Sequence, residues 1–279
     1  MFDRFNRSWN LVKASATVLR QDKHLLVFPF ISGLASLAVV LCFALPIFGL
    51  KAFDGLVDNN GMMYSTAFLF YVVQYFVIFY FNVALVGATM IRMDGGAPTV
   101  ADGLRLANSR LGAILGYAII AATVGVILRA IQERVGFLGR IIVGMLGVGW
   151  TIATFLVVPV LAARKQGPVA SIKESAQMLK HTWGENVIGQ VGISLVFGVV
   201  FVAMGLLGTG LIFASVASGS AALIVAVSVA LGIAFLLALL VQSALAGVYS
   251  AALFRYADKG DASIGFDNSV LQSAFAPKA

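Results

Sequence analysis

Long runs of residues without a charge dominate the pattern of hydrophobic and polar positions along this chain. The runs cover residues 25–50, 59–91, 111–128, 141–163 and 186–254. A membrane-crossing helix needs about 20 apolar residues, because lipid offers the backbone no hydrogen-bond partner. The last run is too long for one crossing, and its Ser- and Gly-rich stretch at 215–220 is typical of a turn. The pattern therefore predicts six spans, at roughly 25–50, 62–91, 111–128, 141–163, 187–214 and 221–254.

Composition supports an all-α integral membrane protein. The chain is 60% hydrophobic and 11% charged, whereas soluble domains have about 45–50% apolar and about 25% charged residues. A cytosolic enzyme, a secreted disulfide scaffold and a nucleic-acid-binding protein are thereby excluded as classes. Cys42 is the single cysteine, so neither an internal disulfide nor a thiolate metal site is expected.

The distribution of Lys and Arg around the spans predicts the orientation. Fifteen of these residues flank one side of the six spans, and four (Lys51, Arg129, Arg134 and Arg140) flank the other. Because cytoplasmic loops carry the excess of positive charge, both termini are expected in the cytoplasm. Arg129 and Glu133 have i, i+4 spacing, which favours a short interfacial helix with partly paired charges in the 129–140 loop.

The net charge of +7 follows the same asymmetry. A basic inner surface attracts anionic lipid headgroups, which makes such lipids possible partners. The same asymmetry is also the default for any inner-membrane protein, so two interpretations stay open.

Three span ends resemble one another and indicate an internal repeat. Spans two, four and six each end with an arginine at the predicted cytoplasmic exit, and a glycine follows each of them. These exit arginines are Arg92, Arg164 and Arg255.

Each repeat begins with an amphipathic segment. Apolar residues recur at steps of three and four over residues 2–19 and 169–183, and more weakly over 100–111. Such stripes indicate helices that lie in the membrane interface, with Phe5, Trp9 and Trp183 as anchors, or helices that pack against the cytoplasmic face of the bundle.

The unit is therefore one amphipathic helix followed by two spans. Three such units are expected, at 1–95, 96–168 and 169–265, with a tail at 266–279, all within one membrane domain. Because two spans return the chain to the same side, the units are parallel copies. A bundle with a pseudo-threefold axis along the membrane normal is the natural packing.

Two motifs carry a family resemblance. The stretches MFDRFNRSWNLVKASATVLRQDKHLLVFP and VVPVLAARKQGPVASIKESAQMLKHTWGE resemble an uncharacterised prokaryotic membrane family, the domain-of-unknown-function 6159 family. The turn after span four is more distantly similar to membrane domains fused to glycerophosphodiester phosphodiesterases. The resemblance implies a six-span inner-membrane protein and supplies no activity or catalytic residue.

Neutral polar residues are the only candidates for a site at mid-membrane. Counting about 1.5 Å per residue back from the exit arginines places four of them near mid-bilayer: Asn82, Thr154, Gln242 and Ser243. They form one polar tier around the threefold axis, or they are unrelated groups that each bond to their own helix or a neighbour.

No metal, cofactor or catalytic constellation is predicted. His181 and Glu185 have i, i+4 spacing, but two ligands do not make a metal site. His24 and Asp22 lack a nucleophile beside them.

Two functions remain. The first is a non-enzymatic membrane scaffold or lipid-interacting protein with a basic cytoplasmic face. The second is a transporter or exporter of an apolar or lipid-like substrate. A protein partner or a homo-oligomer is compatible with either.

Overall fold

The computed structural model describes residues 2–46, 60–183 and 192–260, and every element in these ranges is helical. The elements are α1 (Phe2–Gln21), the 3-10 helix η1 (Lys23–Leu26), α2 (Val27–Ala44), α4 (Asn60–Met93), α5 (Val100–Asn108), α6 (Leu111–Arg134), α7 (Phe137–Ala153), α8 (Val157–Ala163), α9 (Pro168–Trp183), α10 (Gly192–Ala217) and α11 (Ala221–Lys259).

Six segments of these described ranges are long and apolar enough to cross a membrane, which confirms a multi-pass membrane protein. They are Lys23–Ala44, Gly61–Met93, Leu111–Arg134, Phe137–Ala163, Val196–Ala217 and Ala221–Lys259. The third segment extends beyond the predicted end at residue 128. The helix continues as α6 through the first half of the 129–140 loop, so these residues do not form a separate interfacial helix.

Helix α4 is the centre of the fold, and it packs against α2, α5, α6, α8 and α11. Its residues 83–86 and Ala88 are buried. Small residues let helix backbones approach closely, and Gly103 of α5 shows how close this approach is. A Cβ atom at Gly103 would lie 2.7 Å from the backbone oxygen of Ala84. Helix α5 therefore rests directly on the backbone of α4.

The fourth span is broken, whereas the sequence pattern predicted one continuous span at 141–163. Helix α7 ends at Ala153 and α8 begins at Val157, with a turn between them. The buried Pro159 explains the break, because a proline has no N–H to donate and its ring clashes with the carbonyl four residues earlier.

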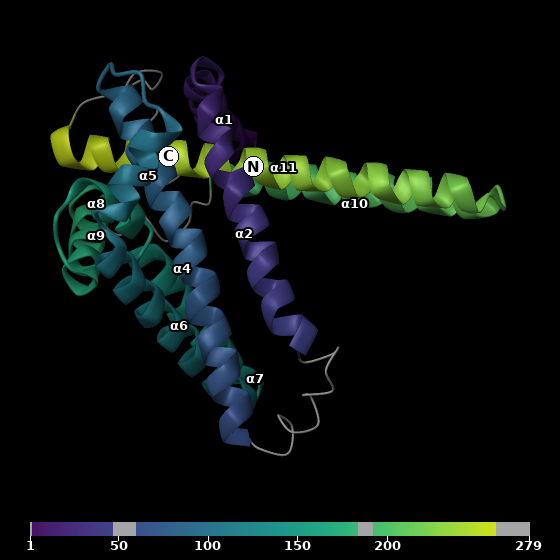
Figure 1. Ribbon diagram of the computed structural model, residues 1–279, viewed down its shortest axis with the longest axis horizontal. Coiled ribbons are helices and arrows are strands. Elements are labelled where there is room, and N and C mark those ends of the chain that lie inside the picture. Colours follow the sequence, from purple (N-terminus) through teal and green to yellow (C-terminus); the bar gives the residue numbers. More distant parts are fainter. Residues whose placement is uncertain (1, 47–59, 184–191, 261–279) are drawn as a thin grey trace.

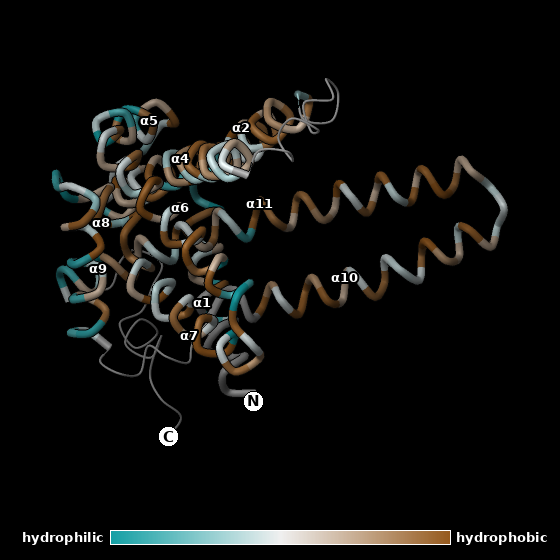
Figure 2. Tube along the Cα trace, turned by 90° about the horizontal axis from the view of Figure 1, so that it is seen from below, coloured by the Kyte–Doolittle hydropathy of each residue, from teal (hydrophilic) through white to brown (hydrophobic). Residues whose placement is uncertain are grey.

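Helices α10 and α11 form a hairpin that runs across the direction of α2, α4 and α6 and projects beyond them (Figure 1). The hairpin is hydrophobic along both helices (Figure 2), and large side chains such as Leu206, Leu207 and Phe213 are more than 70% exposed. Burial among the other helices is concentrated at the base of the hairpin, in the final part of α11 from Ala244 to Phe254 and at Val196 and Phe197 of α10. The structure thus departs from the expected arrangement about a pseudo-threefold axis, because the third pair of spans does not lie alongside the first two.

All three amphipathic helices pack against other elements. Helix α1 contacts α10 and α11, α5 contacts α4, and α9 contacts α6, α7, α8 and α11. The apolar stripes therefore cover the base of the hairpin and the bundle. Whether they also lie in a membrane interface stays a prediction, as does the division into three repeats.

Candidate functional site

The exit arginines lie at one end of the molecule, which we call the basic end. It is formed by the C-terminal ends of α4, α8 and α11, where Arg92, Arg164 and Arg255 lie. Within the part of the chain that the structure describes, two of the three arginines make ion pairs between elements.

Arg164 joins three helices. At the end of α8 its Nε donates to Glu174 Oε1 of α9 at 3.1 Å, and its Nη2 donates to Asp258 Oδ1 of α11 at 2.5 Å. Gln166 donates to the other oxygen of Glu174 at 2.6 Å. The hydrogen bond to Glu174, together with the charge of Asp258, raises the pKa of the Arg164 guanidinium. This side chain is 44% exposed, so each pair contributes only about 0–1 kcal/mol.

Arg255 joins α11 to the turn after α4. Its Nη1 donates to Asp94 Oδ1 at 2.5 Å, and Lys259 Nζ lies 3.9 Å from the same oxygen. Among the described residues, Arg92 bonds only within its own turn, to the carbonyl oxygen of Gly96 at 3.4 Å. Arg164 and Arg255 therefore join the ends of helices, and acidic side chains match much of their charge.

The remaining cations on and before α9 are exposed. Lys165, Lys173 and Lys180 are exposed, and no ion pair involves them within the described residues. Lys173 and Lys180 are seven residues apart, which places them on one face of the helix. The opposite face buries Ser175 and Leu179. Helix α9 thus presents a basic outer face and packs with its inner face.

The hydroxyl of Ser175 joins α9 to the fourth span by hydrogen bonds at the break between α7 and α8. This hydroxyl accepts a hydrogen bond from the N–H of Leu156 at 3.0 Å and donates one to the carbonyl oxygen of Ala153 at 2.7 Å. Both backbone groups lose their helical partners at the break, and a buried unpaired backbone group is costly. The sequence pattern did not single out Ser175, because it does not show that α9 lies beside the break.

The four residues of the predicted polar tier lie on α4, on α11 and in the turn between α7 and α8, and all are half-buried. Thr154 lies at the break, where its hydroxyl donates to the carbonyl oxygen of Trp150 at 2.8 Å. No hydrogen bond joins Asn82, Thr154, Gln242 or Ser243 to one another in the described part of the chain. The tier remains a prediction.

The predicted interfacial anchors are only partly described. Trp9 on α1 is 42% exposed, and Lys13 Nζ lies 5.8 Å from the centre of its ring. The side chains of Phe5 and Trp183 lie outside the described residues.

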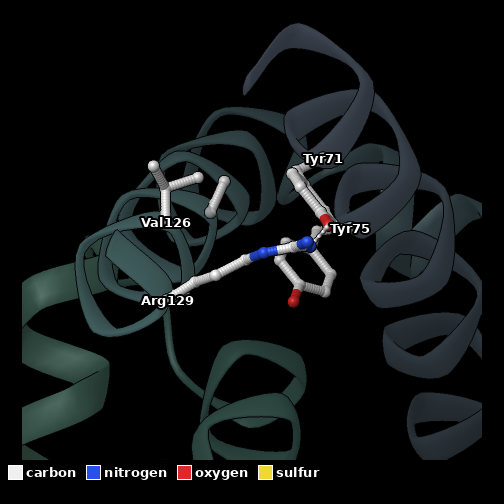
Figure 3. A pocket seen from close by; sticks show the side chains of 6 residues that line it. Tyr71, Tyr75, Val126 and Arg129 are labelled. Carbon is white, nitrogen blue, oxygen red and sulfur yellow. Dashed lines mark hydrogen bonds between the residues drawn. The ribbon is translucent and has the colours of Figure 1, made fainter. Parts of the chain in front are cut away.

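A second group of polar side chains lies near the other ends of α4 and α6 (Figure 3). Arg129 Nη1 donates to the hydroxyl of Tyr71 at 3.3 Å, and its Nε donates to Glu133 Oε1 at 3.1 Å. The expected pairing of Arg129 with Glu133 is thereby confirmed. The Tyr71 ring stacks with that of Tyr75 at a centroid distance of 6.2 Å. Tyr71, Tyr75 and Arg129 line a cavity of about 130 Å³.

The tyrosines of this second group were not predicted as site residues. An arginine in an otherwise apolar helix could have indicated them, but the predicted third span ended one residue before Arg129.

No group of three or more potential metal ligands is found among the described residues. Glu185, which was considered together with His181, lies outside them.

In comparisons with known proteins, the chain matches the model of one protein family. No curated protein and no solved structure matches it significantly. The sequence model of a family of unknown function, DUF6159, matches residues 61–265, which is more than half of the chain. This match includes α4 to α11 and thus the ion pairs of the basic end, the broken span and the Arg129 group. The chain therefore belongs to the family of unknown function DUF6159.

Proposed function

We propose that the chain is a non-enzymatic integral membrane protein that binds anionic lipid headgroups at its basic end and acts there as a scaffold. In this proposal the basic end faces the cytoplasm, as the excess of Lys and Arg on that side favours. The membrane is the bacterial inner membrane.

The observation that carries the proposal is the exposed basic face of α9. Arg164 and Gln166 already engage the nearby carboxylate of Glu174, so that acid is not available to neutralise the lysines. Lys173 and Lys180 extend from a helix that the buried Ser175 fixes to the bundle. A juxtamembrane lysine near an anionic surface contributes about 1 kcal/mol.

The test measures the preference for anionic lipid of the full chain in mixed phosphatidylglycerol–phosphatidylcholine nanodiscs, by counting the lipids that stay bound in native mass spectrometry. Replacing Lys173 and Lys180 together with Gln should weaken this preference by about 30-fold, since two interactions of about 1 kcal/mol are lost. The matched double replacement by Arg should retain the preference, because the charge is kept. An unchanged preference in the Gln variant would refute the proposal.

The alternative proposal is a transporter or exporter of an apolar or lipid-like substrate. The broken fourth span supports it, because discontinuous helices form the substrate sites of many transporters. The hydroxyl of Ser175 supports the scaffold instead, since it already engages the backbone groups that a substrate would meet at the break. Uptake of a fluorescent phospholipid analogue into proteoliposomes, compared with protein-free liposomes, separates the two proposals.

A further inference from the structure

The Arg129 group lies about one hydrocarbon thickness from the basic end. Along α6, Arg129 is 18 residues from Leu111, or about 27 Å. Along α4, Tyr71 is 21 residues from Arg92, or about 31 Å. These two independent lengths agree with the roughly 30 Å of a bilayer core. When the basic end is at one membrane interface, Arg129 is therefore at the headgroup level of the other, which is also where tyrosines concentrate.

Two cavities meet at Arg129. The smaller one, about 130 Å³, lies between α4 and α6 and has an apolar wall made by Ala122, Gly125 and Val126. The larger one, about 370 Å³, is lined by Arg129, Gln132, Glu133 and Arg140, at the end of α6 and the start of α7. A single guanidinium thus borders an apolar cavity on one side and a polar, more open one on the other.

The hydrogen-bonding groups of this site favour an anion. A guanidinium has five N–H donors, and Arg129 uses its Nε for Glu133 and its Nη1 for Tyr71. Because the Tyr71 hydroxyl accepts from Arg129, its own proton stays available to donate. Arg140 and the amide of Gln132 add further donors in the larger cavity. Two cations against one carboxylate leave an excess positive charge.

We propose that this site binds the phosphate group of an acidic amphiphile, with Arg129 and Arg140 holding the phosphate oxygens and an apolar chain lying against the wall at Gly125. Arginine suits this role because its planar fork matches phosphate oxygens. Gly125 keeps the small cavity open, since a Cβ there would lie 3.8 Å from the Tyr75 hydroxyl and a longer side chain would fill it. The site is at the opposite end from the lysines of α9, so it goes beyond the function proposed above.

The test compares three ligands on the full chain in a nonionic detergent. Dioleoylphosphatidylglycerol carries both phosphate and chains, dioleoylglycerol carries only the chains, and inorganic phosphate carries only the anion. Binding is measured by native mass spectrometry and by the shift of Tm. We expect the phospholipid to bind more tightly than dioleoylglycerol. Inorganic phosphate that binds as tightly as the phospholipid would assign the same anion site to free phosphate. Equal binding of the phospholipid and dioleoylglycerol would overturn the proposal.

Variants locate the binding. Arg129→Gln should weaken phospholipid binding about tenfold or more, the size expected when a charged hydrogen-bond partner is removed. Gly125→Leu should weaken it by filling the small cavity while every charge is kept. Arg134 lies at the same end of α6 and lines neither cavity. Arg134→Gln is therefore the matched control, and this variant should bind the phospholipid as the wild type does. If both Arg129→Gln and Gly125→Leu bind like the control, the proposal is wrong. Lys173 and Lys180 line neither cavity, so their replacement should leave binding at this site unchanged, and the two proposals can fail separately.

Discussion

At the scale of single residues, the buried hydroxyl groups of Ser175 and Ser171 differ in whether their hydrogen bonds join separate helices. Ser175 and Ser171 are both fully buried on α9. The hydroxyl of Ser171 donates a local hydrogen bond, to the carbonyl oxygen of Gly167 four residues earlier, at 3.1 Å. Ser175 instead joins two helices, because it bonds to both sides of the break between α7 and α8. The loss of the Ser175 hydroxyl therefore leaves two backbone groups without partners. The loss of the Ser171 hydroxyl leaves none, because the backbone N–H of Ser171 also donates to the carbonyl oxygen of Gly167, at 3.0 Å.

Ser175→Ala is expected to lower the free energy of unfolding by about 1–3 kcal/mol, the cost of leaving buried polar groups unsatisfied. Ser171→Ala, the matched control on the same face of α9, should have a smaller effect. Both are measured by thermal or denaturant unfolding in one detergent. Equal effects of the two variants would contradict the role given to Ser175.

At the scale of elements, α4 and α11 approach each other closely at one glycine, Gly247. A Cβ at Gly247 would overlap Cδ2 of Leu85, a residue that is fully buried on α4. Gly232, on the same helix, has nothing within 4 Å of the position of its Cβ. Because residue 247 has no side chain, the base of the hairpin can pack directly against Leu85 of α4.

Gly247→Val should destabilise the packing of α11 on α4 by about 1–3 kcal/mol, the usual cost of an overpacked core. Gly232→Val serves as the control for the change of residue type and should leave the packing unchanged. The unfolding temperature in detergent and the protease sensitivity of α11 measure the effect. A Gly247→Val protein as stable as the Gly232→Val protein would show that the contact does not hold the hairpin.

At the scale of the whole molecule, the hairpin of α10 and α11 requires an apolar environment, because most of its large hydrophobic side chains are exposed. Its 26-residue α10 is about 39 Å long, which is enough to cross a bilayer core of about 30 Å. A helix that is apolar on all sides is suited to a membrane span and not to an interface, where one face meets water. Because the hairpin is held only at its base, we expect it to cross the membrane once a bilayer surrounds the protein.

Impermeant thiol labelling tests this expectation in a Cys42→Ser background. Ser218→Cys, in the exposed turn of the hairpin, should be labelled from the same side of the membrane as Gly136→Cys in the α6–α7 turn. Ser109→Cys, close to the basic end, should be labelled from the opposite side. Labelling of Ser218→Cys and Ser109→Cys from one side would mean that the hairpin lies along the basic end, as in Figure 1.

Much of the architecture was predictable from the sequence alone. Six apolar segments and the turn near Ser218–Gly219 follow from runs of neighbouring residues, because hydrophobic length and turn chemistry are local properties. The pairing of Arg129 with Glu133 was predictable for the same reason, since helix geometry relates residues four apart. The break at Thr154–Leu156 was missed, although Pro159 indicated it, because the uncharged run continued through it.

Only the tertiary structure decided which distant residues meet. The hydroxyl of Tyr71 lies against Arg129 across 58 positions of sequence, and Arg255 reaches Asp94 across 161. Ser175 fills a break in another helix, and the hairpin runs across the bundle instead of joining it about a threefold axis. Such contacts depend on the directions in which whole helices pack, and these directions are set by ridges, small residues and charges on several elements at once. A one-dimensional pattern of apolar and polar positions records which residues avoid water, but it does not record which partner each of them finds.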